Sequence, residues 1–346
     1  MKEITNLIPI YIAPTSTKKL DNLYSQKRET VSKVNVEEIK KQIDEYLTND
    51  KISKKEKPEI AFYGSNFFEL SDKVQETLFE IVDEYVVSKK VRGAQIRINP
   101  INITVEKIRV MKKHHIKTVE IIIGSSSNYI LKKSKRKYTI EDIRKIKKML
   151  RFSFIKTGYV MNIGMIDSKE NDEFNTAKEI LKLKPKFVVI SPMLVYKGTE
   201  LAKKYATEDY EALSVDAAAQ RCKEITYMFK KNGLDDVRIE LYDTNQKYDD
   251  VATAENVVAG PFHPAFNKYV EGMMWYDSIA EKIKNTNSKV KRLEVEINPE
   301  DLDRAVGYNK ANIEKLKDMY DIKVDIKSNP EMKIGKFEIK VIENYQ

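Results

Sequence analysis

Residues 8–26 read IPIYIAPTSTKKLDNLYSQ, and this stretch changes character half-way along. The residues from Leu7 to Ala13 form a short apolar run, which is typical of a buried strand. The remainder is polar and contains no cysteine, so it predicts a long polar loop. A buried strand that opens into a loop is the usual beginning of a unit in an α/β protein.

Outward from this stretch, apolar runs of strand length alternate with segments of helical period. The predicted elements are a helix over 35–49, a strand over 59–63, a helix over 71–88, a strand over 94–98, a helix over 104–113, a strand over 118–123, a helix over 140–151, a strand over 154–163, a helix over 170–183, a strand over 187–191, a helix over 214–231 and a strand over 237–242. This alternation predicts a parallel sheet, and six or seven such units suit a closed or partly open barrel. In barrels the functional groups lie at the carboxyl ends of the strands.

The composition excludes several classes of protein. The chain has 346 residues, enough for one barrel-sized domain and a smaller one. No apolar run reaches the length of a membrane span, and the N-terminus lacks a signal-peptide pattern, so we expect a cytoplasmic protein without a membrane partner. Cys222 is the only cysteine, which excludes a disulfide framework and a cysteine metal site. With only three histidines, a histidine metal centre is also disfavoured.

Positive charge is in excess and is concentrated in one run. The net charge of +9 favours nucleic acid as a partner, although a general lysine bias would give the same balance. Residues 132–138, KKSKRKY, follow the fourth predicted strand as a basic loop that can contact several phosphates of a polynucleotide. A solvated surface loop without a ligand is the alternative interpretation. The cations of this run are Lys132, Lys133, Lys135, Arg136 and Lys137.

Four motifs follow one another along the chain: IPIYI at 8–12, IAFYGSNF at 60–67, SPMLVYKGTEL at 191–201 and GPFHPAF at 260–266. Together they resemble radical-SAM enzymes of the Elongator catalytic-subunit, MiaB- and NifB-like type. The KGTEL and GPFHPAF segments are the most specific parts of the resemblance. It implies a partial TIM-type (β/α)6 barrel over residues 1–268, followed by a connecting helix and linker over 269–288.

The same resemblance identifies a cluster loop that has lost its ligands. Where the family has three cysteines, spaced Cys-x-x-x-Cys-x-x-Cys, this chain has Thr17, Asp21 and Tyr24. Thiolates hold a [4Fe–4S] cluster because soft sulfur ligands suit its irons, whereas hydroxyl and carboxylate oxygens are hard ligands. We therefore expect no iron–sulfur cluster, and no electron to cleave S-adenosylmethionine.

The strand ends that hold S-adenosylmethionine in the family are also altered. The family's second glycine is Ser65 here, and its glycine-rich turn has become GMIDS at residues 164–168. Whether the cofactor still binds is left open. The resemblance assigns its pocket to Tyr63, Gly64, Ser65, Asn66, Arg97, Glu120 and Ser125.

Two residues of the retained motifs, Lys197 and His263, are weak candidates for catalysis in the barrel mouth. The pKa of an imidazole lies near neutrality, so His263 is suited to substrate binding or proton transfer. Its position between two prolines, in a rigid turn, equally suits a histidine held by hydrogen bonds for structure.

Residues 289–346 form a second unit, with a strand over 290–297, helices over 299–306 and 312–319, and strands over 322–326 and 336–342. Within this small α+β unit, AVGYNKANIEKL at 305–316 resembles the GXXG loop of KH domains, which clamps about four nucleotides. Helix N-terminal amides face phosphates in such a loop. An appendage for dimerisation or barrel capping is the alternative. The implied contact residues are Gly307, Tyr308, Asn309, Lys310, which replaces the second glycine, and Asn312.

These observations leave three functional hypotheses. The first is a cluster-free radical-SAM-like pseudoenzyme that binds RNA, either tRNA or rRNA, through the KH-like domain and the basic barrel face. The second is an enzyme of non-radical chemistry, or a protein that binds S-adenosylmethionine or a metabolite, using Lys197, His263, Asp21 or Tyr24. The third is a regulatory subunit that pairs with a cluster-bearing radical-SAM paralogue.

Overall fold

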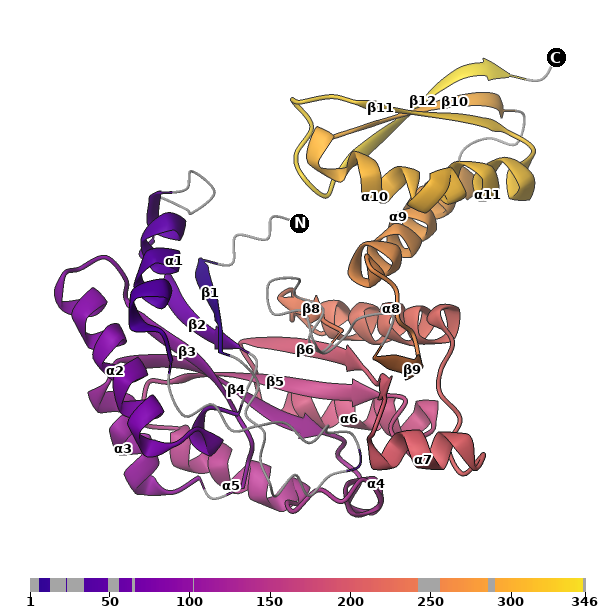
Figure 1. Ribbon diagram of the computed structural model, residues 1–346. Helices are drawn as coiled ribbons and strands as arrows, with labels where there is room; N and C mark the ends of the chain where they lie inside the picture. Colours follow the sequence, from indigo (N-terminus) through magenta and orange to yellow (C-terminus); the bar gives the residue numbers. More distant parts are fainter. Residues whose placement is uncertain are drawn as a thin grey trace. The chain divides into compact units, whose positions relative to one another are not determined.

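A computed structural model describes residues 6–12, 23, 34–48, 56–63, 66–101, 103–241, 256–285 and 290–344. Contacts divide the chain into two compact units, one ending at Phe262 and the other beginning at His263. Each unit has its own sheet and its own helices (Figure 1). Within these ranges, no helix combines the length and the apolar character needed to cross a membrane.

The first unit repeats a strand followed by a helix. Its main strands are β1 (Leu7–Tyr11), β2 (Glu59–Tyr63), β3 (Gly93–Ile98), β4 (Ile116–Gly124), β5 (Lys156–Ile163), β6 (Phe187–Pro192) and β8 (Val237–Ile239). Its helices are α1 (Val36–Thr48), α2 (Asp72–Val87), α3 (Val105–Lys113), α4 (Asn128–Lys133), α5 (Ile140–Leu150), α6 (Glu170–Lys182), α7 (Glu200–Ala206) and α8 (Val215–Lys231). A short antiparallel pair, β7 (Val195–Tyr196) with β9 (Val257–Ala259), completes the unit.

The main sheet is parallel throughout, with the strand order β1-β2-β3-β4-β5-β6-β8. Chain order and spatial order agree because the helical crossovers return the chain to the next position along the sheet. The sheet is curled, since Arg97 on β3 forms an ion pair with Glu240, just beyond β8, although three strands lie between β3 and β8. The α/β partial-barrel prediction is therefore confirmed, with seven strands where a (β/α)6 barrel has six.

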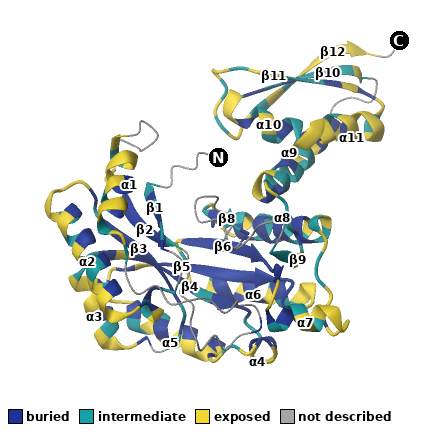
Figure 2. Ribbon diagram, in the orientation of Figure 1, coloured by how far each residue is buried: buried dark blue, intermediate teal, exposed yellow. Residues whose placement is uncertain are grey.

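The two faces of this sheet differ in chemistry. All six residues of β3 are buried, and side chains alternate between the faces along a strand. Ile96 and Ile98 lie on the face covered by helices, whereas Gln95 and Arg97 lie on the concave face. In Figure 2 the strands of the sheet are mostly dark blue, and the helices alternate between buried and exposed residues, as expected for a helical layer over a core.

Hydroxyl caps determine where several helices begin. Ser71, Thr104, Thr139 and Ser214 each precede a helix, and each side chain accepts a hydrogen bond from a backbone N–H of the first turn. A cap of this kind contributes about 1 kcal/mol because it satisfies an amide that has no acceptor within the helix. The four predicted helices that follow these caps therefore begin within one residue of the observed ones.

The prediction of a loop over residues 132–138 was wrong in part. Lys132 and Lys133 end α4, which Ser127 caps, and Ser134 and Tyr138 beyond it are buried. A six-residue helix spans less than two turns, which is too short for a helical period to show in the sequence. The same reason explains why α7 was not predicted.

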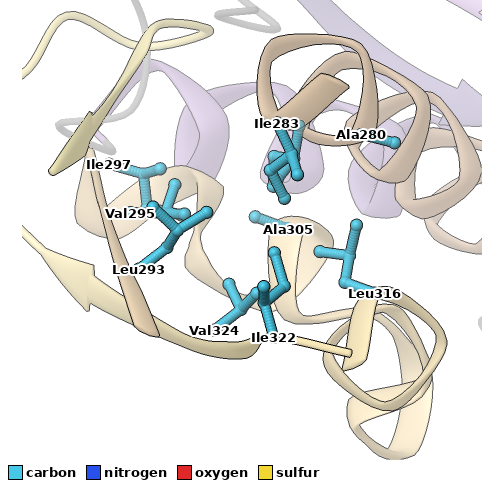
Figure 3. Close-up of a cluster of buried hydrophobic side chains, with 10 residues drawn as sticks. Ala280, Ile283, Leu293, Val295, Ile297, Ala305, Leu316, Ile322 and Val324 are labelled. Carbon is cyan, nitrogen blue, oxygen red and sulfur yellow. The ribbon is translucent and has the colours of Figure 1, made fainter. Parts of the chain in front are cut away.

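The second unit contains α9 (Phe266–Lys284), β10 (Val290–Ile297), α10 (Leu302–Val306), α11 (Ala311–Tyr320), β11 (Lys323–Ser328) and β12 (Phe337–Asn344). β10 is the central strand, parallel to β11 and antiparallel to β12. Figure 3 shows how α9 packs: Ala280 and Ile283 point toward the apolar side chains of β10, β11, α10 and α11. This helix is therefore part of the unit's core.

Candidate functional site

Polar side chains meet on the concave face of the half-barrel. Gln95 and Arg97 of β3 lie on the same face, and Arg97 is in register with Glu120 of β4. Gln95 Nε2 donates to Glu120 Oε1 at 2.6 Å, and Arg97 Nε donates to Glu120 Oε2 at 2.6 Å. Both oxygens of this carboxylate therefore have a donor.

The far end of the sheet contributes to the same cluster. Arg97 Nη2 donates to Glu240 Oε2 at 3.0 Å, and Arg238 Nη1 on β8 lies 3.9 Å from Glu120 Oε1. The Arg238 guanidinium also covers the ring of Phe187, with 4.1 Å between the guanidinium carbon and the ring centroid. These contacts join β3 and β4 to β8 across the concave face, so they stabilise the curvature of the sheet.

Burial governs the protonation of this cluster. Glu120 is fully buried, and burial raises the pKa of its carboxyl against the opposing influence of Arg97. Burial likewise raises the pKa of Tyr63 well above its usual value; its ring stacks on Tyr11 with 5.6 Å between centroids. Because Glu120 is held by two donors, it is suited to position Arg97 rather than to exchange protons.

The structure brings together three of the predicted cofactor-pocket residues, Tyr63, Arg97 and Glu120. Two others hold turns: Asn66 Oδ1 accepts from the backbone N–H of Asn99 at 2.9 Å, and Ser125 Oγ accepts from the N–H two residues on at 3.1 Å. The remaining predicted positions of the pocket and of the cluster loop lie outside the described residues; they are Thr17, Asp21, Tyr24, Gly64 and Ser65.

Sequence reasoning missed Gln95, Arg238 and Glu240. A signal was present, because polar residues two apart (95 with 97, and 238 with 240) interrupt otherwise apolar strands. This spacing places both members of a pair on one face of a strand. In a barrel, the helices cover the outer face of the sheet with their apolar sides. A polar pair within a strand therefore indicates that the concave face is polar.

Leu23 is the one residue of the stretch 13–26 that the structure describes. Its side chain is fully buried in an apolar cluster with Ile130, Met165 and Leu201. Its backbone N–H donates to the Ser134 carbonyl at 3.4 Å, and its carbonyl accepts from the Leu201 N–H at 2.9 Å.

The cysteine content of the chain does not fit an iron–sulfur cluster. Cys222 lies on α8 with a fully buried side chain, and burial raises the pKa of its thiol. A [4Fe–4S] cluster is held by several thiolates, and a single inert thiol does not supply them. In the part of the chain that the structure describes, no three His, Cys, Asp or Glu side chains are grouped to hold a metal ion.

The KGTEL motif is the start of a helix. Gly198 has a φ of +75°, a left-handed conformation that glycine adopts without strain. Thr199 Oγ1 donates to the Tyr196 carbonyl at 2.7 Å and caps α7 by accepting from a first-turn amide at 3.1 Å. Lys197 is exposed, and its backbone N–H donates to the carbonyl of Asn256 at 2.9 Å.

His263 lies in the second unit, just before α9. Its Nδ1 accepts from the backbone N–H of Ala265 at 3.1 Å. The imidazole also lies between two aromatic rings, with 5.6 Å to the centroid of Tyr269 and 5.3 Å to that of Tyr308 in an edge-on arrangement. These contacts fix the orientation of the ring and leave Nε2 to carry the proton of the neutral imidazole.

Residues that follow β4, β5 and β6 line a cavity of about 630 Å³ at the carboxyl end of the sheet. Two of its lysines are paired: Lys135 Nζ lies 2.5 Å from Glu200 Oε1, and Lys133 Nζ lies 3.5 Å from Asp167 Oδ2. Beyond it, Arg136 is half-buried and Lys137 is exposed. The cations that line the cavity are Lys132, Lys133, Lys135 and Lys204.

The loop between α10 and α11 has a left-handed backbone at three residues: φ is 79° at Gly307, 52° at Asn309 and 63° at Lys310. Lys310 therefore takes the conformation that favours glycine, the residue that the KH resemblance expects there. Tyr308, Asn309 and Lys310 are exposed, and no side chain caps α11.

Asn312, by contrast, is directed into the unit. Its side-chain amide donates to the carbonyl oxygens of Gly272 at 2.8 Å and Ala305 at 3.0 Å. A Cβ on Gly307 would lie 2.9 Å from Asn312 Cγ, so this glycine also makes room for the amide. These hydrogen bonds connect the start of α11 to α9 and α10.

No protein-family model matches the chain. The chain is 31% identical to the tRNA uridine(34) acetyltransferase of Methanocaldococcus jannaschii over 118 residues, which are 33% of this chain and 22% of that protein. Its structure is similar to that of the archaeal Methanocaldococcus infernus Elp3, with a TM-score of 0.58 and 19% identity over 82% of this chain and 64% of that one. The chain thus spans less than two thirds of the length of either relative.

The half-barrel is that of the radical-SAM fold. Another similar structure is coproporphyrinogen III oxidase (HemN) from Escherichia coli, a radical SAM enzyme, with a TM-score of 0.45 and 12% identity over 66% of this chain and 53% of that one. At these identities the likeness is one of fold.

Proposed function

We propose that this chain is an RNA-binding protein built on a radical-SAM-like half-barrel that does not perform radical chemistry. The observation that carries the proposal is the exposed loop from Gly307 to Lys310. It leads directly into α11, which no side chain caps; the Ala311 N–H donates to the Tyr308 carbonyl, and the amides that follow in the first turn lack acceptors within the helix. A phosphate beside this loop meets those amides and the Lys310 ammonium together.

Two further observations support RNA as the ligand. The similar enzyme from Methanocaldococcus jannaschii is named for a tRNA uridine, and its similarity to this chain covers 118 residues. Lys132 and Lys133, exposed at the end of α4, add positive charge to the first unit, and Lys133 shares its charge with Asp167. The proposal does not extend acetyl transfer to this chain.

The absence of radical chemistry rests on the ligand set. The sequence holds Thr17, Asp21 and Tyr24 where the family has thiolates, and the only thiol, Cys222, is buried in α8. Oxygen ligands are hard and do not replace three thiolates in a [4Fe–4S] cluster. Without the cluster, the half-barrel has no source of the electron that cleaves S-adenosylmethionine.

The test is the binding of labelled tRNA by the full chain across a salt series. We expect Lys310→Glu to weaken binding and to lower the slope of log K against log salt by about one. Lys310→Gly removes the charge but keeps the left-handed backbone, so it isolates electrostatics from loop geometry and weakens binding less than Lys310→Glu. Lys333→Glu, an equal charge change at another exposed site of the same unit, is the matched control.

The outcomes separate clearly. Binding that is independent of salt overturns the proposal, because phosphate contacts release counterions. Equal losses in Lys310→Glu and Lys333→Glu indicate attraction by net charge and contradict a site at the loop. Reversal of Lys132 and Lys133 together tests the contribution of α4 in the same assay.

A second candidate function is favoured by the cavity of about 630 Å³ at the carboxyl end of the sheet. Its volume is in the range of small-molecule sites, and it lies where barrels bind their ligands. Calorimetric titration of the full chain with S-adenosylmethionine tests it. A saturable heat that is lost in Lys132→Glu supports this function, and no heat counts against it.

A further inference from the structure

The amino ends of β4, β5 and β6 carry a concentration of positive charge, and the RNA site proposed at the loop 307–310 does not use it. These strands are neighbours in a parallel sheet, so the segments that precede them meet at one edge. The segments 112–117, 148–156 and 182–186 contain nine Lys and Arg and no Asp or Glu. That number equals the net charge of +9 of the whole chain, and all nine side chains are exposed.

The register of the strands aligns three of these lysines. Lys156 at the start of β5 is paired with Thr118, the residue after Lys117 on β4. Lys186 donates its backbone N–H to the carbonyl of Thr157 at 2.8 Å, so the start of β6 lies on the other side of β5. Adjacent strands lie about 5 Å apart. Lys117, Lys156 and Lys186 therefore occupy neighbouring positions along this edge of the sheet.

Acidic groups near these segments form ion pairs, and Asp236, which precedes β8 beside β6, is paired with Arg238 of its own strand. Glu179 binds Arg144 at 2.8 Å and Lys182 at 3.3 Å, and Asp83 lies 2.8 Å from Nδ1 of His114. These pairs account for one of the nine cations, Lys182, and the edge remains strongly positive.

Two phenylalanines project from the middle segment. Phe152 is 78% exposed and Phe154 is 94% exposed, whereas Ser153 between them is buried. Ser153 Oγ donates to the Leu150 carbonyl at 2.7 Å and accepts from the Ile155 N–H at 3.1 Å. These hydrogen bonds lock the turn and hold one ring outward on each side of it.

This arrangement is costly for the isolated fold. Phe154 has a φ of 62°, a left-handed conformation that is strained for a bulky side chain. Both rings also forgo the favourable burial that an aromatic side chain usually obtains. The Arg151 guanidinium carbon lies 5.4 Å from the centroid of Phe152 and covers one part of that ring. Strain and exposure maintained together by a rigid turn indicate a ligand for the rings.

We propose that this surface, the amino-edge patch (Lys117, Phe152, Phe154, Lys156, Lys184 and Lys186), binds a single-stranded segment of RNA. Bases stack on the two rings, and the phosphates follow the lysines along the sheet edge. A duplex hides its base faces, so the rings select unpaired nucleotides. A line of cations along an edge matches a linear polyanion. The inference takes the class of ligand from the proposed function but uses a different surface.

The test is fluorescence anisotropy of the full chain with a labelled, unstructured oligoribonucleotide of about ten nucleotides, within the usual range for such sites. We expect Phe152→Ala/Phe154→Ala to weaken binding about tenfold or more, from the loss of two stacked bases. Phe152→Tyr/Phe154→Tyr keeps two stacking rings and retains the affinity. Because both side chains are exposed, neither double variant removes core packing.

Two further measurements separate binding at the amino-edge patch from binding at the loop 307–310 and from binding to lipid. Structured tRNA is measured with the same variants; the alanine pair leaves its affinity within about twofold if it binds at the loop 307–310. Unchanged oligonucleotide binding in the alanine pair overturns the patch, whatever Lys310→Glu does to tRNA. Loss of binding to phosphatidylserine vesicles, with oligonucleotide binding unchanged, overturns it in favour of a lipid surface.

Discussion

Glu173 shows how one buried side chain can couple the fold to pH. It lies on α6, almost fully buried, and its Oε1 accepts from the Gly164 N–H at 2.7 Å and from Arg221 at 3.0 Å. Its Oε2 is buried without a hydrogen-bond donor. Burial outweighs the two donors and raises the pKa of the carboxyl from its ordinary value of 4.5 to about 7.

The consequence is a stability that falls as the pH rises. The folded state binds this proton more tightly than the unfolded state, so the contribution is complete below about pH 4.5 and is lost as the pH rises through about 7. We expect Glu173→Gln, which cannot ionise, to lose this dependence, which amounts to at most about 3 kcal/mol. Thermal unfolding of both proteins between about pH 5 and about pH 8 measures it. Parallel slopes contradict the expectation, and Glu170→Gln, exposed on the same helix, is the control.

At the scale of elements, Asn312 joins α9 to α10 and α11. Its amide donates to the carbonyl oxygens of Gly272 and Ala305 from a position only 7% exposed. We expect Asn312→Ala to destabilise the second unit by about 1–3 kcal/mol, because these carbonyls lose their donor inside the protein. Asn312→Asp costs more once ionised, since a carboxylate then faces carbonyl oxygens.

The chain supplies its own probe for this prediction. Trp275, the only tryptophan, lies on α9 against the core of the second unit, 5.8 Å from the ring of Phe337. Denaturant unfolding followed by its fluorescence therefore reports on this unit. Lys317→Ala, at an exposed position of α11, is expected to change little. Recovery of Asn312→Asp on acidification supports the role of charge, and equal stability of Ala and Asp variants at neutral pH argues against it.

The elements were predictable from sequence wherever their signal is local. Apolar runs such as 59–63 and capped helices such as the one after Ser71 carry their own period and boundary. α4 and α7 were missed because six or seven residues are too few for a period. The ion pair of Arg97 with Glu240 joins residues far apart in the chain, and so does the hydrogen bond of Asn312 to Gly272. No local sequence pattern encodes such a pairing. The alternating polar residues of β3 were the available clue.

At the scale of the first unit as a whole, the concave cluster decides how the sheet holds its curvature. Arg97 binds Glu120 at 2.6 Å and Glu240 at 3.0 Å, and so joins neighbouring strands to the far end of the sheet. Removing one member of a buried pair leaves an uncompensated charge, whereas replacing both is far less harmful. Arg97→Met should therefore cost about 3–5 kcal/mol, and Arg97→Met/Glu120→Gln much less.

The pH dependence makes this last prediction specific. Arg97 lowers the pKa of Glu120 against burial, so its removal raises that pKa further above the unfolded value. The stability of Arg97→Met should then fall as the pH rises, because a carboxyl with a raised folded pKa contributes most when protonated. The double variant has no carboxyl at this position and lacks the effect. Circular dichroism melts across the acid-to-neutral range measure all three proteins, with Glu240→Gln, whose carboxylate is partly exposed, as a milder control. A double variant less stable than Arg97→Met at neutral pH would show that the cluster stabilises the curvature through packing, and that its charges are not the deciding contribution.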